Sequence, residues 1–261
     1  MTTSAPVPAL DRDLIARLRF DVIAASWTTD TLETLLSDGA LSALMRDSRL
    51  PALVELAGVT DPAATLTRFF VLGQPERASA LDAALPTLGA AGLETLGLAA
   101  TIDEDEAASA LVMPRPYSKS APKRERAQAG EGEEASFPTA PALPTMRDPD
   151  EEPEPEVVVD PWMRALYDLR PHAAALPGGE HEWWVTSDLG EGQTGKPLAD
   201  HHVMGIGGAT RTLLEMTVRD QVDSALDVGC GCGIQALYLA THARRVVATD
   251  LSARACALTQ F

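Results

Sequence analysis

The N-terminal part of the chain carries apolar residues at the spacing of short helices. One face of a first helix is predicted by four residues at regular intervals of one helical turn: Leu10, Leu14, Leu18 and Val22. The same period returns in residues 32–36, 66–72 and 78–85, and briefly near Leu93. This pattern predicts a mainly α-helical domain over residues 10–113.

Capping residues indicate where some of these helices begin and end. Asp61 followed by Pro62 is typical of a helix start, because aspartate accepts from free N–H groups and proline is tolerated in the first turn. Gly73 is expected to end that helix. Asp30 with Glu33 resembles a capping box for an earlier helix.

The last part of this domain, residues 108–113, has the composition of a strand. Several short helices followed by a hairpin-like end would suit a winged-helix-like module. Such modules often bind nucleic acid. Because no helix here carries a row of Arg or Lys, we favour a packing or substrate-orienting domain.

Residues 114–160 break every apolar period. Proline recurs every few positions, and acidic residues outnumber basic ones. Such a segment buries too little apolar surface to offset the entropy lost on ordering. We predict a disordered acidic, proline-rich linker or insertion.

Residues 161–205 regain an ordered pattern and predict a β-containing connector. Trp183, Trp184 and Val185 suit a strand, and residues 188–195 suit a glycine-rich turn. Adjacent tryptophans can stack on nucleic acid bases. Because neighbouring strand residues face opposite sides, we favour a packing role, with one ring in the core and the other on the adjacent domain.

The last part of the chain contains the pattern of a nucleotide-binding βαβ unit. Residues 226–228 read as a buried strand, residues 229–233 as a glycine turn and residues 234–242 as a helix. Glycines allow a backbone to pass close under a ligand and to adopt positive φ. A second strand, residues 246–249, ends in Asp250. A dinucleotide fingerprint would require a third glycine at position 234, where this chain has isoleucine.

The run Asp227-Val-Gly-Cys-Gly-Cys-Gly233 instead resembles motif I of class I methyltransferases that use S-adenosylmethionine (SAM). The resemblance implies an α/β Rossmann-like methyltransferase fold beginning near residue 206, preceded by the helical N-terminal domain. It implies that Asp227 helps to hold the methionine ammonium group. It also implies that Asp250 accepts hydrogen bonds from both ribose hydroxyls, for which two carboxylate oxygens are suited.

The resemblance to this family also gives the set of expected cofactor contacts. Those of the two strands and the turn are Asp227, Gly229, Cys230, Gly231, Gly233, Asp250 and Leu251. A glycine cluster that opens a helix just before the motif is similar to the loop that closes over SAM in the small-domain group, and it adds Gly207, Gly208 and Thr210.

Within class I, the layout resembles the group of release-factor glutamine methyltransferases and certain ribosomal RNA guanine methyltransferases. The methyl acceptor is therefore expected to be a protein glutamine or an RNA base. That group orients its acceptor with an Asn-Pro-Pro-Tyr/Phe motif, and this chain contains no asparagine. We therefore name no catalytic residue, and we expect the chain to be an inactive N-terminal portion of a longer enzyme. The alternative is a non-catalytic interaction or regulatory module built on the helical domain.

The composition limits the partners and the compartment. A net charge of −17 argues against general affinity for nucleic acid backbones or anionic membranes. The first residues lack a signal-peptide pattern, and no run approaches the ~18 apolar residues of a membrane-spanning helix. We expect a cytoplasmic protein, and the excess of Arg over Lys suggests a GC-rich bacterial genome. Cys230, Cys232 and Cys256 are expected to be reduced thiols; a Cys-x-Cys metal site is the alternative, but a metal would compete with the cofactor for the turn.

Overall fold

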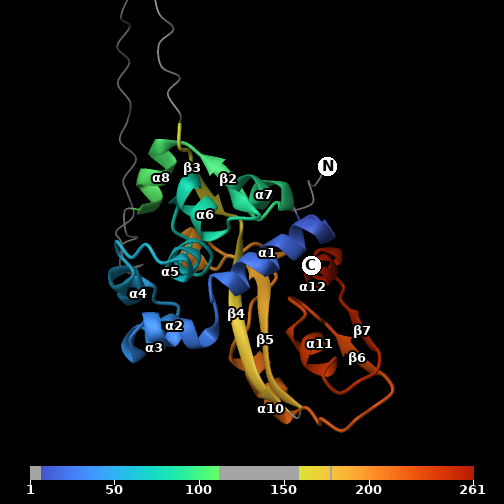
Figure 1. The fold of residues 1–261 in the computed structure, drawn as a ribbon. Helices are drawn as coiled ribbons and strands as arrows, with labels where there is room; N and C mark the ends of the chain where they lie inside the picture. Colours follow the sequence, from blue (N-terminus) through green and yellow to red (C-terminus); the bar gives the residue numbers. More distant parts are fainter. Residues whose placement is uncertain (1–6, 112–158, 177) are drawn as a thin grey trace, which may run out of the picture. The chain divides into compact units, whose positions relative to one another are not determined.

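The computed structural model describes residues 7–111, 159–176 and 178–261. In the N-terminal part, short helices predominate (Figure 1). Its elements are α1 (Arg12–Ala24), α2 (Thr29–Leu35), α3 (Asp38–Leu44), α4 (Leu50–Glu55), α5 (Pro62–Leu66), the π-helical turn η1 (Thr67–Val71), β1 (Glu76–Arg77), α6 (Ala78–Ala84), α7 (Gly89–Leu96), β2 (Ala99–Ile102) and α8 (Glu104–Leu111). The linker predicted over residues 114–160 lies outside the described residues except for its last two positions.

The helix start predicted at Asp61 is confirmed. The Asp61 carboxylate accepts hydrogen bonds from the backbone N–H groups of Ala63 and Ala64, and Pro62 is the first helical residue. The α5 helix continues into η1, and Gly73 follows with a φ of +61°. The predicted stop at Gly73 is therefore also confirmed, because only glycine adopts this backbone conformation without strain.

The capping box predicted at Asp30 and Glu33 is wrong. The residue that caps α2 is Thr28, whose hydroxyl accepts from the backbone N–H of Thr31. Asp30 lies inside the first turn, where a carboxylate still interacts favourably with the helix dipole. Several polar residues in succession can each serve as a cap, and their local pattern does not select among them.

The strand predicted over residues 108–113 is wrong for its described part. Residues 108–111 belong to α8, and residues 112–113 lie outside the described part of the chain. Asp103 begins this helix by accepting from the backbone N–H of Glu106, and the first turn is acidic throughout. The strand of this region lies earlier, as β2.

Residues from the predicted connector complete a sheet of the N-terminal part. The strand β3 (Trp162–Ala165) lies between β1 and β2 and is antiparallel to both. Its partners in β2 precede it by more than fifty residues in the sequence, with Ala99 opposite Ala165 and Ile102 opposite Trp162. The helical domain and the connector therefore share a structural unit.

The connector continues as the long antiparallel hairpin β4 (Tyr167–Leu176) and β5 (Gly179–Asp188), drawn in yellow and orange in Figure 1. Its two adjacent tryptophans face opposite sides. The Trp184 indole donates to the backbone carbonyl of Trp27, a core residue of the helical part. The Trp183 ring lies 5.3 Å from the Tyr238 ring, centroid to centroid. The packing interpretation of this pair is confirmed. Where a turn was predicted after the hairpin, a short helix α9 (Glu191–Thr194) occurs.

The last part of the chain is a parallel βαβ unit. It contains α10 (Gly208–Met216), β6 (Ala225–Val228), α11 (Ile234–Leu239), β7 (Val246–Thr249) and α12 (Ala253–Gln260). The β6 and β7 strands pair in parallel, with Asp227 opposite Ala248. The bounds of both strands agree with the sequence pattern to within one residue, and α11 ends earlier than predicted.

One face of this two-stranded sheet is exposed. Leu226, Val228 and Val247 are 62%, 76% and 44% exposed. Parallel sheets are normally covered on both faces, so these side chains form an apolar surface that a complete α/β sheet would bury. Among the described residues, no helix is both long enough and apolar enough to cross a membrane.

Candidate functional site

The turn between β6 and α11 takes its shape from glycines at positive φ. Gly231 has a φ of +53° and Gly233 a φ of +81°. A Cβ on Gly233 would lie 2.9 Å from the Thr259 side chain and 3.2 Å from its Cα, so α12 packs directly on this residue. A Cβ on Gly231 would meet no heavy atom of the described residues within 4 Å. Gly233 is therefore needed for packing, whereas Gly231 keeps the turn open on its other side.

Asp227 is a buried carboxylate with an unpaired oxygen. The residue is 8% exposed, and its Oδ2 atom has no hydrogen-bond partner in the part of the chain that the structure describes. Burial raises the pKa of this carboxyl group, a backbone hydrogen bond from Ala236 lowers it, and the charge of Asp250 raises it. An unpaired buried carboxylate oxygen is costly, and a cationic hydrogen-bond donor would satisfy it.

Asp250 follows β7 and faces the same turn. Its Oδ2 atom accepts from the backbone N–H of Gly231 at 3.0 Å, and its Oδ1 atom accepts from that of Ser252 at 2.8 Å. These hydrogen bonds, that from Ser252 first, hold the pKa of the carboxyl group below its usual range. Each oxygen keeps further acceptor capacity, because a carboxylate accepts about four hydrogen bonds. The next residue, Leu251, is a fully exposed apolar side chain.

The glycine cluster before the motif lies at the start of α10. Gly207 caps this helix and Gly208 is its first residue. The Thr210 carbonyl accepts from the Gln235 side chain, at 3.1 Å, and Gln235 lies in the first turn of α11. This hydrogen bond brings the beginning of α10 beside the beginning of α11, and so beside the glycine turn.

Two cysteines of the turn have buried side chains. Cys230 and Cys232 are buried, and burial raises the pKa of both thiols. The Thr259 hydroxyl donates to the Cys230 sulfur at 3.2 Å. The Cys230 side chain is therefore directed toward α12, while its backbone N–H donates to Thr249.

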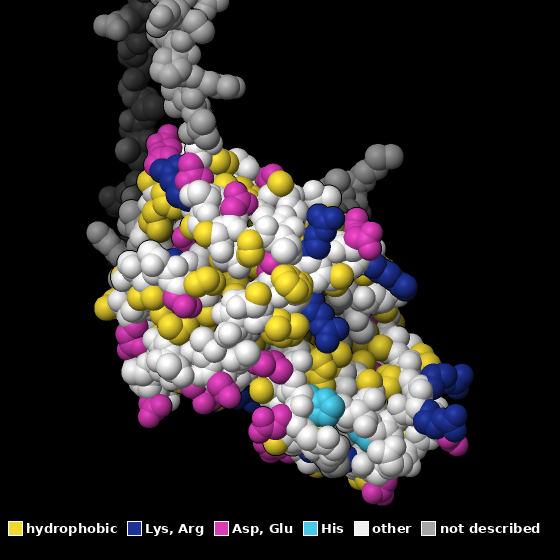
Figure 2. Space-filling view, viewed as in Figure 1, with side chains coloured by type: hydrophobic (Ala, Val, Ile, Leu, Met, Phe, Trp, Pro, Cys, Tyr) yellow, Lys and Arg dark blue, Asp and Glu magenta, His cyan; other side chains and the backbone are white. Residues whose placement is uncertain are grey.

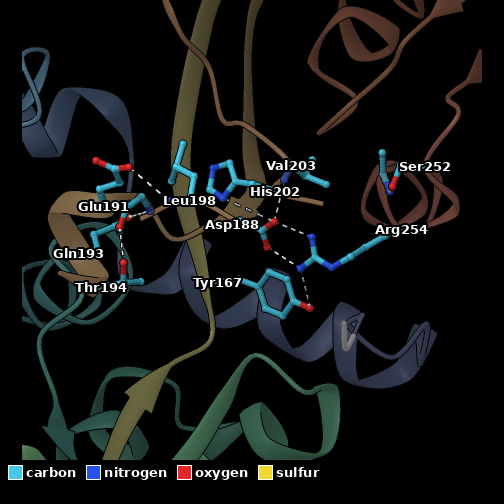
Figure 3. Close-up of polar contacts among 12 residues, drawn as sticks. Tyr167, Asp188, Glu191, Gln193, Thr194, Leu198, His202, Val203, Ser252 and Arg254 are labelled. Carbon is cyan, nitrogen blue, oxygen red and sulfur yellow. Dashed lines mark hydrogen bonds and ion pairs between the residues drawn. The ribbon is translucent and has the colours of Figure 1, made fainter. Parts of the chain in front are cut away.

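Three residues that the sequence analysis did not name also shape this site. Ser252 caps α12 and donates to Asp250. Arg254, two residues later, forms a two-pronged ion pair with Asp188 at the end of β5 (Figure 3). A local signal for Ser252 exists, since a serine that precedes a helical segment is a typical cap. The pairing of Asp188 with Arg254 spans 66 residues and leaves no local signal.

The site thus combines two carboxylates on neighbouring strands, an open glycine turn between them and an exposed apolar residue. The Asp227 oxygen suits a cationic amine. The remaining acceptor capacity of Asp250 suits a pair of hydroxyl donors. The arrangement fits a ligand that carries an ammonium group at one end and a polyhydroxylated ring at the other.

Comparisons with known proteins address the helical part alone. Residues 24–110 match a family model described as a domain of unknown function, DUF7059. A search of curated proteins finds no match to this chain. The matched residues extend from α1 to α8 and do not include the glycine turn or either of its carboxylates.

Proposed function

We propose that residues 206–261 form the first part of a SAM-binding site in a Rossmann-like methyltransferase. The observation that carries the proposal is the buried Oδ2 atom of Asp227, which has no hydrogen-bond partner among the described residues and lies on the strand that leads into the turn held by Asp250. In this proposal Asp227 receives the methionine ammonium group and Asp250 receives the ribose hydroxyls. Leu251 supplies an apolar surface for the adenine ring. The exposed apolar face of β6 and β7 supports a further layer packed on this sheet, as in an α/β fold.

SAM supplies an electrophilic methyl group on a sulfonium centre. The residues of this chain bind and orient it, and orientation of two bound reactants accounts for much of the catalysis in such a transfer. The acceptor is a nitrogen of a protein glutamine or of an RNA base, in the cytoplasm.

We assign the N-terminal part the role of a winged-helix-like domain that orients the substrate. The order α5, η1, β1, α6, α7, β2, α8, β3, with β3 between the other two strands, supports this assignment. The α7 helix, which would enter a DNA groove in such a module, contains no Lys or Arg. On the face drawn in Figure 2, acidic side chains are spread over the described helical part, and basic side chains are sparse there. A protein surface is therefore a better partner for this domain than a nucleic acid backbone.

The proposal predicts stabilisation by SAM and by S-adenosylhomocysteine, but not by a nicotinamide dinucleotide. A ligand at ten times its dissociation constant stabilises the folded state by about 1.4 kcal/mol, which raises the melting temperature by a few degrees. Thermal melts of the chain with each ligand at millimolar concentration test this. Stabilisation by the dinucleotide alone would contradict the assignment of ligand class.

SAM affinity is expected to fall as the pH is lowered through the pKa of Asp227. Burial raises that pKa above the range of an ordinary aspartate, and only the ionised carboxylate attracts the ammonium group. As the pH falls, SAM affinity is therefore lost at a higher pH than it would be if the carboxyl group were that of an exposed aspartate. Binding of SAM near this pKa releases protons, because SAM binds the ionised form of Asp227. The Asp227→Asn variant should bind weakly and lack this pH dependence. Titrations from neutral to acidic pH check the prediction, and identical pH profiles in the two proteins would refute it.

A further inference from the structure

Asp188 lies where the connector meets both sides of the candidate cofactor site. It is the last residue of β5, and its side chain is 14% exposed. Its Oδ2 atom accepts from the backbone N–H of Val203 at 2.7 Å, and its own backbone N–H donates to the Val203 carbonyl at 3.0 Å. Both carboxylate oxygens also accept from the Arg254 guanidinium. Figure 3 shows Val203 and Arg254 reaching this one carboxylate from different segments.

The first of these segments leads into α10. Val203 is followed by Gly205, where a Cβ would lie 2.8 Å from the Ser187 hydroxyl, so the backbone here packs on the end of β5. Gly207 and Gly208 come next and begin α10. The two hydrogen bonds between Asp188 and Val203 therefore fix the position of the backbone from which the glycine cluster extends toward the turn.

The second segment leads to the carboxylate that we assign to the ribose. Arg254 lies in the first turn of α12, two residues after Ser252. Ser252 donates to Asp250, and Asp250 accepts from Gly231 in the turn. A series of direct contacts thus runs from Asp188 through the start of α12 to Asp250 and the open glycine.

The ion pair between Asp188 and Arg254 is largely buried and holds the two side chains in one arrangement. The Arg254 side chain is 10% exposed, and its guanidinium also donates to the Tyr167 hydroxyl at 3.4 Å. The Nδ1 atom of His202 lies 3.9 Å from the Oδ2 atom of Asp188. Loss of the carboxylate would remove the counter-charge that Asp188 provides to the largely buried guanidinium, and the guanidinium is then expected to move or to draw in water. By contrast, the pair of Arg244 with Asp223 is exposed on both sides.

We propose that Asp188 is a positioning residue for the cofactor site, which sets the distance between the glycine cluster at the start of α10 and the carboxylate of Asp250. This role rests on the SAM site proposed above. Asp188 need not touch the cofactor, because it acts through Val203 and Arg254. The two sides of the site would then be held by a single carboxylate of the connector.

The first test compares amide hydrogen exchange in the unliganded wild-type chain and in Asp188→Asn. Exchange at Gly231 and Ser252, neither of which contacts Asp188, is expected to become about tenfold faster. The matched control is Asp223→Asn, which makes the same chemical change at the exposed pair and should leave both amides unaffected. Unchanged exchange at Gly231 and Ser252 in Asp188→Asn would overturn the proposal. This readout does not depend on SAM, so failure of the proposed function would be seen separately, as a wild-type chain that does not respond to SAM.

The second test is a double-mutant cycle on SAM binding. Asp188→Asn is expected to weaken SAM binding by about tenfold, since a small displacement of binding groups has effects of at least this size. Combined with Asp250→Ala, its effect should become smaller, because the contact series through Arg254 then no longer ends at a carboxylate, while that through Val203 remains. Fully additive losses would indicate a merely structural role and would overturn the proposal. If Asp188→Asn does not fold, Arg254→Lys keeps the charge but loses the two-pronged geometry, and the same two outcomes apply to it.

Discussion

The Gly231→Val substitution is expected to weaken SAM binding strongly while leaving the chain folded. Gly231 has a positive φ, and the space beside it contains no heavy atom of the described residues. A branched side chain would project into the open space beside Gly231, where we propose that the cofactor binds. Overpacking of this kind costs up to about 3 kcal/mol, which corresponds to an increase of up to about a hundredfold in the dissociation constant. Titration with SAM followed by NMR measures the loss even when binding is weak.

The matched control for this variant is Gly58→Val in the helical part. Gly58 has a φ of +73°, and a Cβ there also meets no described heavy atom within 4 Å. Both substitutions therefore impose a similar backbone strain, on the order of 1–3 kcal/mol. Similar losses of melting temperature, with SAM binding weakened in Gly231→Val alone, are expected. Equal SAM affinity in the two variants would show that the turn is not part of the SAM site.

The Asp250→Ala substitution is expected to weaken SAM binding by about 1.5–3 kcal/mol. This is the range for hydrogen bonds to a charged group, and it corresponds to about ten- to a hundredfold in the dissociation constant. The hydrogen bonds from Gly231 and Ser252 keep Asp250 ionised, which strengthens its acceptor character. Removal of the carboxylate also frees both N–H groups, so part of the loss will come from a looser turn.

A change in the ligand separates these two contributions. S-Adenosylhomocysteine that lacks the ribose hydroxyls should bind wild type about as weakly as the intact ligand binds Asp250→Ala. It should lose little further affinity in the variant, because the interaction is already absent. An equal loss for both ligands on substitution would show that Asp250 supports the turn and does not contact the ribose.

The sequence predicted the βαβ unit well because its signals are local. Glycines at alternate positions after an apolar run indicate a turn that needs positive φ, and all three have positive φ. The Asp61–Pro62 start was predicted for the same reason. The strand predicted at residues 108–113 failed, because an apolar run of this length does not distinguish strand from helix and Asp103 supplied a cap.

Contacts between distant segments could not be predicted from any local pattern. The pairing of β3 with β2 joins residues that are separated by the linker. The ion pair of Asp188 with Arg254 depends on how the hairpin packs on α12. The unpaired oxygen of Asp227 is likewise a property of burial, which the glycine motif alone does not reveal. The methyltransferase assignment and the winged-helix-like role remain predictions.

The most direct test of the central claim is an NMR titration of chain labelled with ¹⁵N in its glycines, using SAM up to millimolar concentration. If SAM binds at this turn, we expect concentration-dependent chemical-shift changes of the glycine amides around the proposed cofactor, namely Gly207, Gly208, Gly229, Gly231 and Gly233. The glycines of the helical part should remain unchanged and serve as internal controls, namely Gly39, Gly58, Gly73, Gly89, Gly92 and Gly97. Shifts confined to the helical part, or no shifts in either set, would contradict the claim that SAM binds at the turn between Asp227 and Asp250.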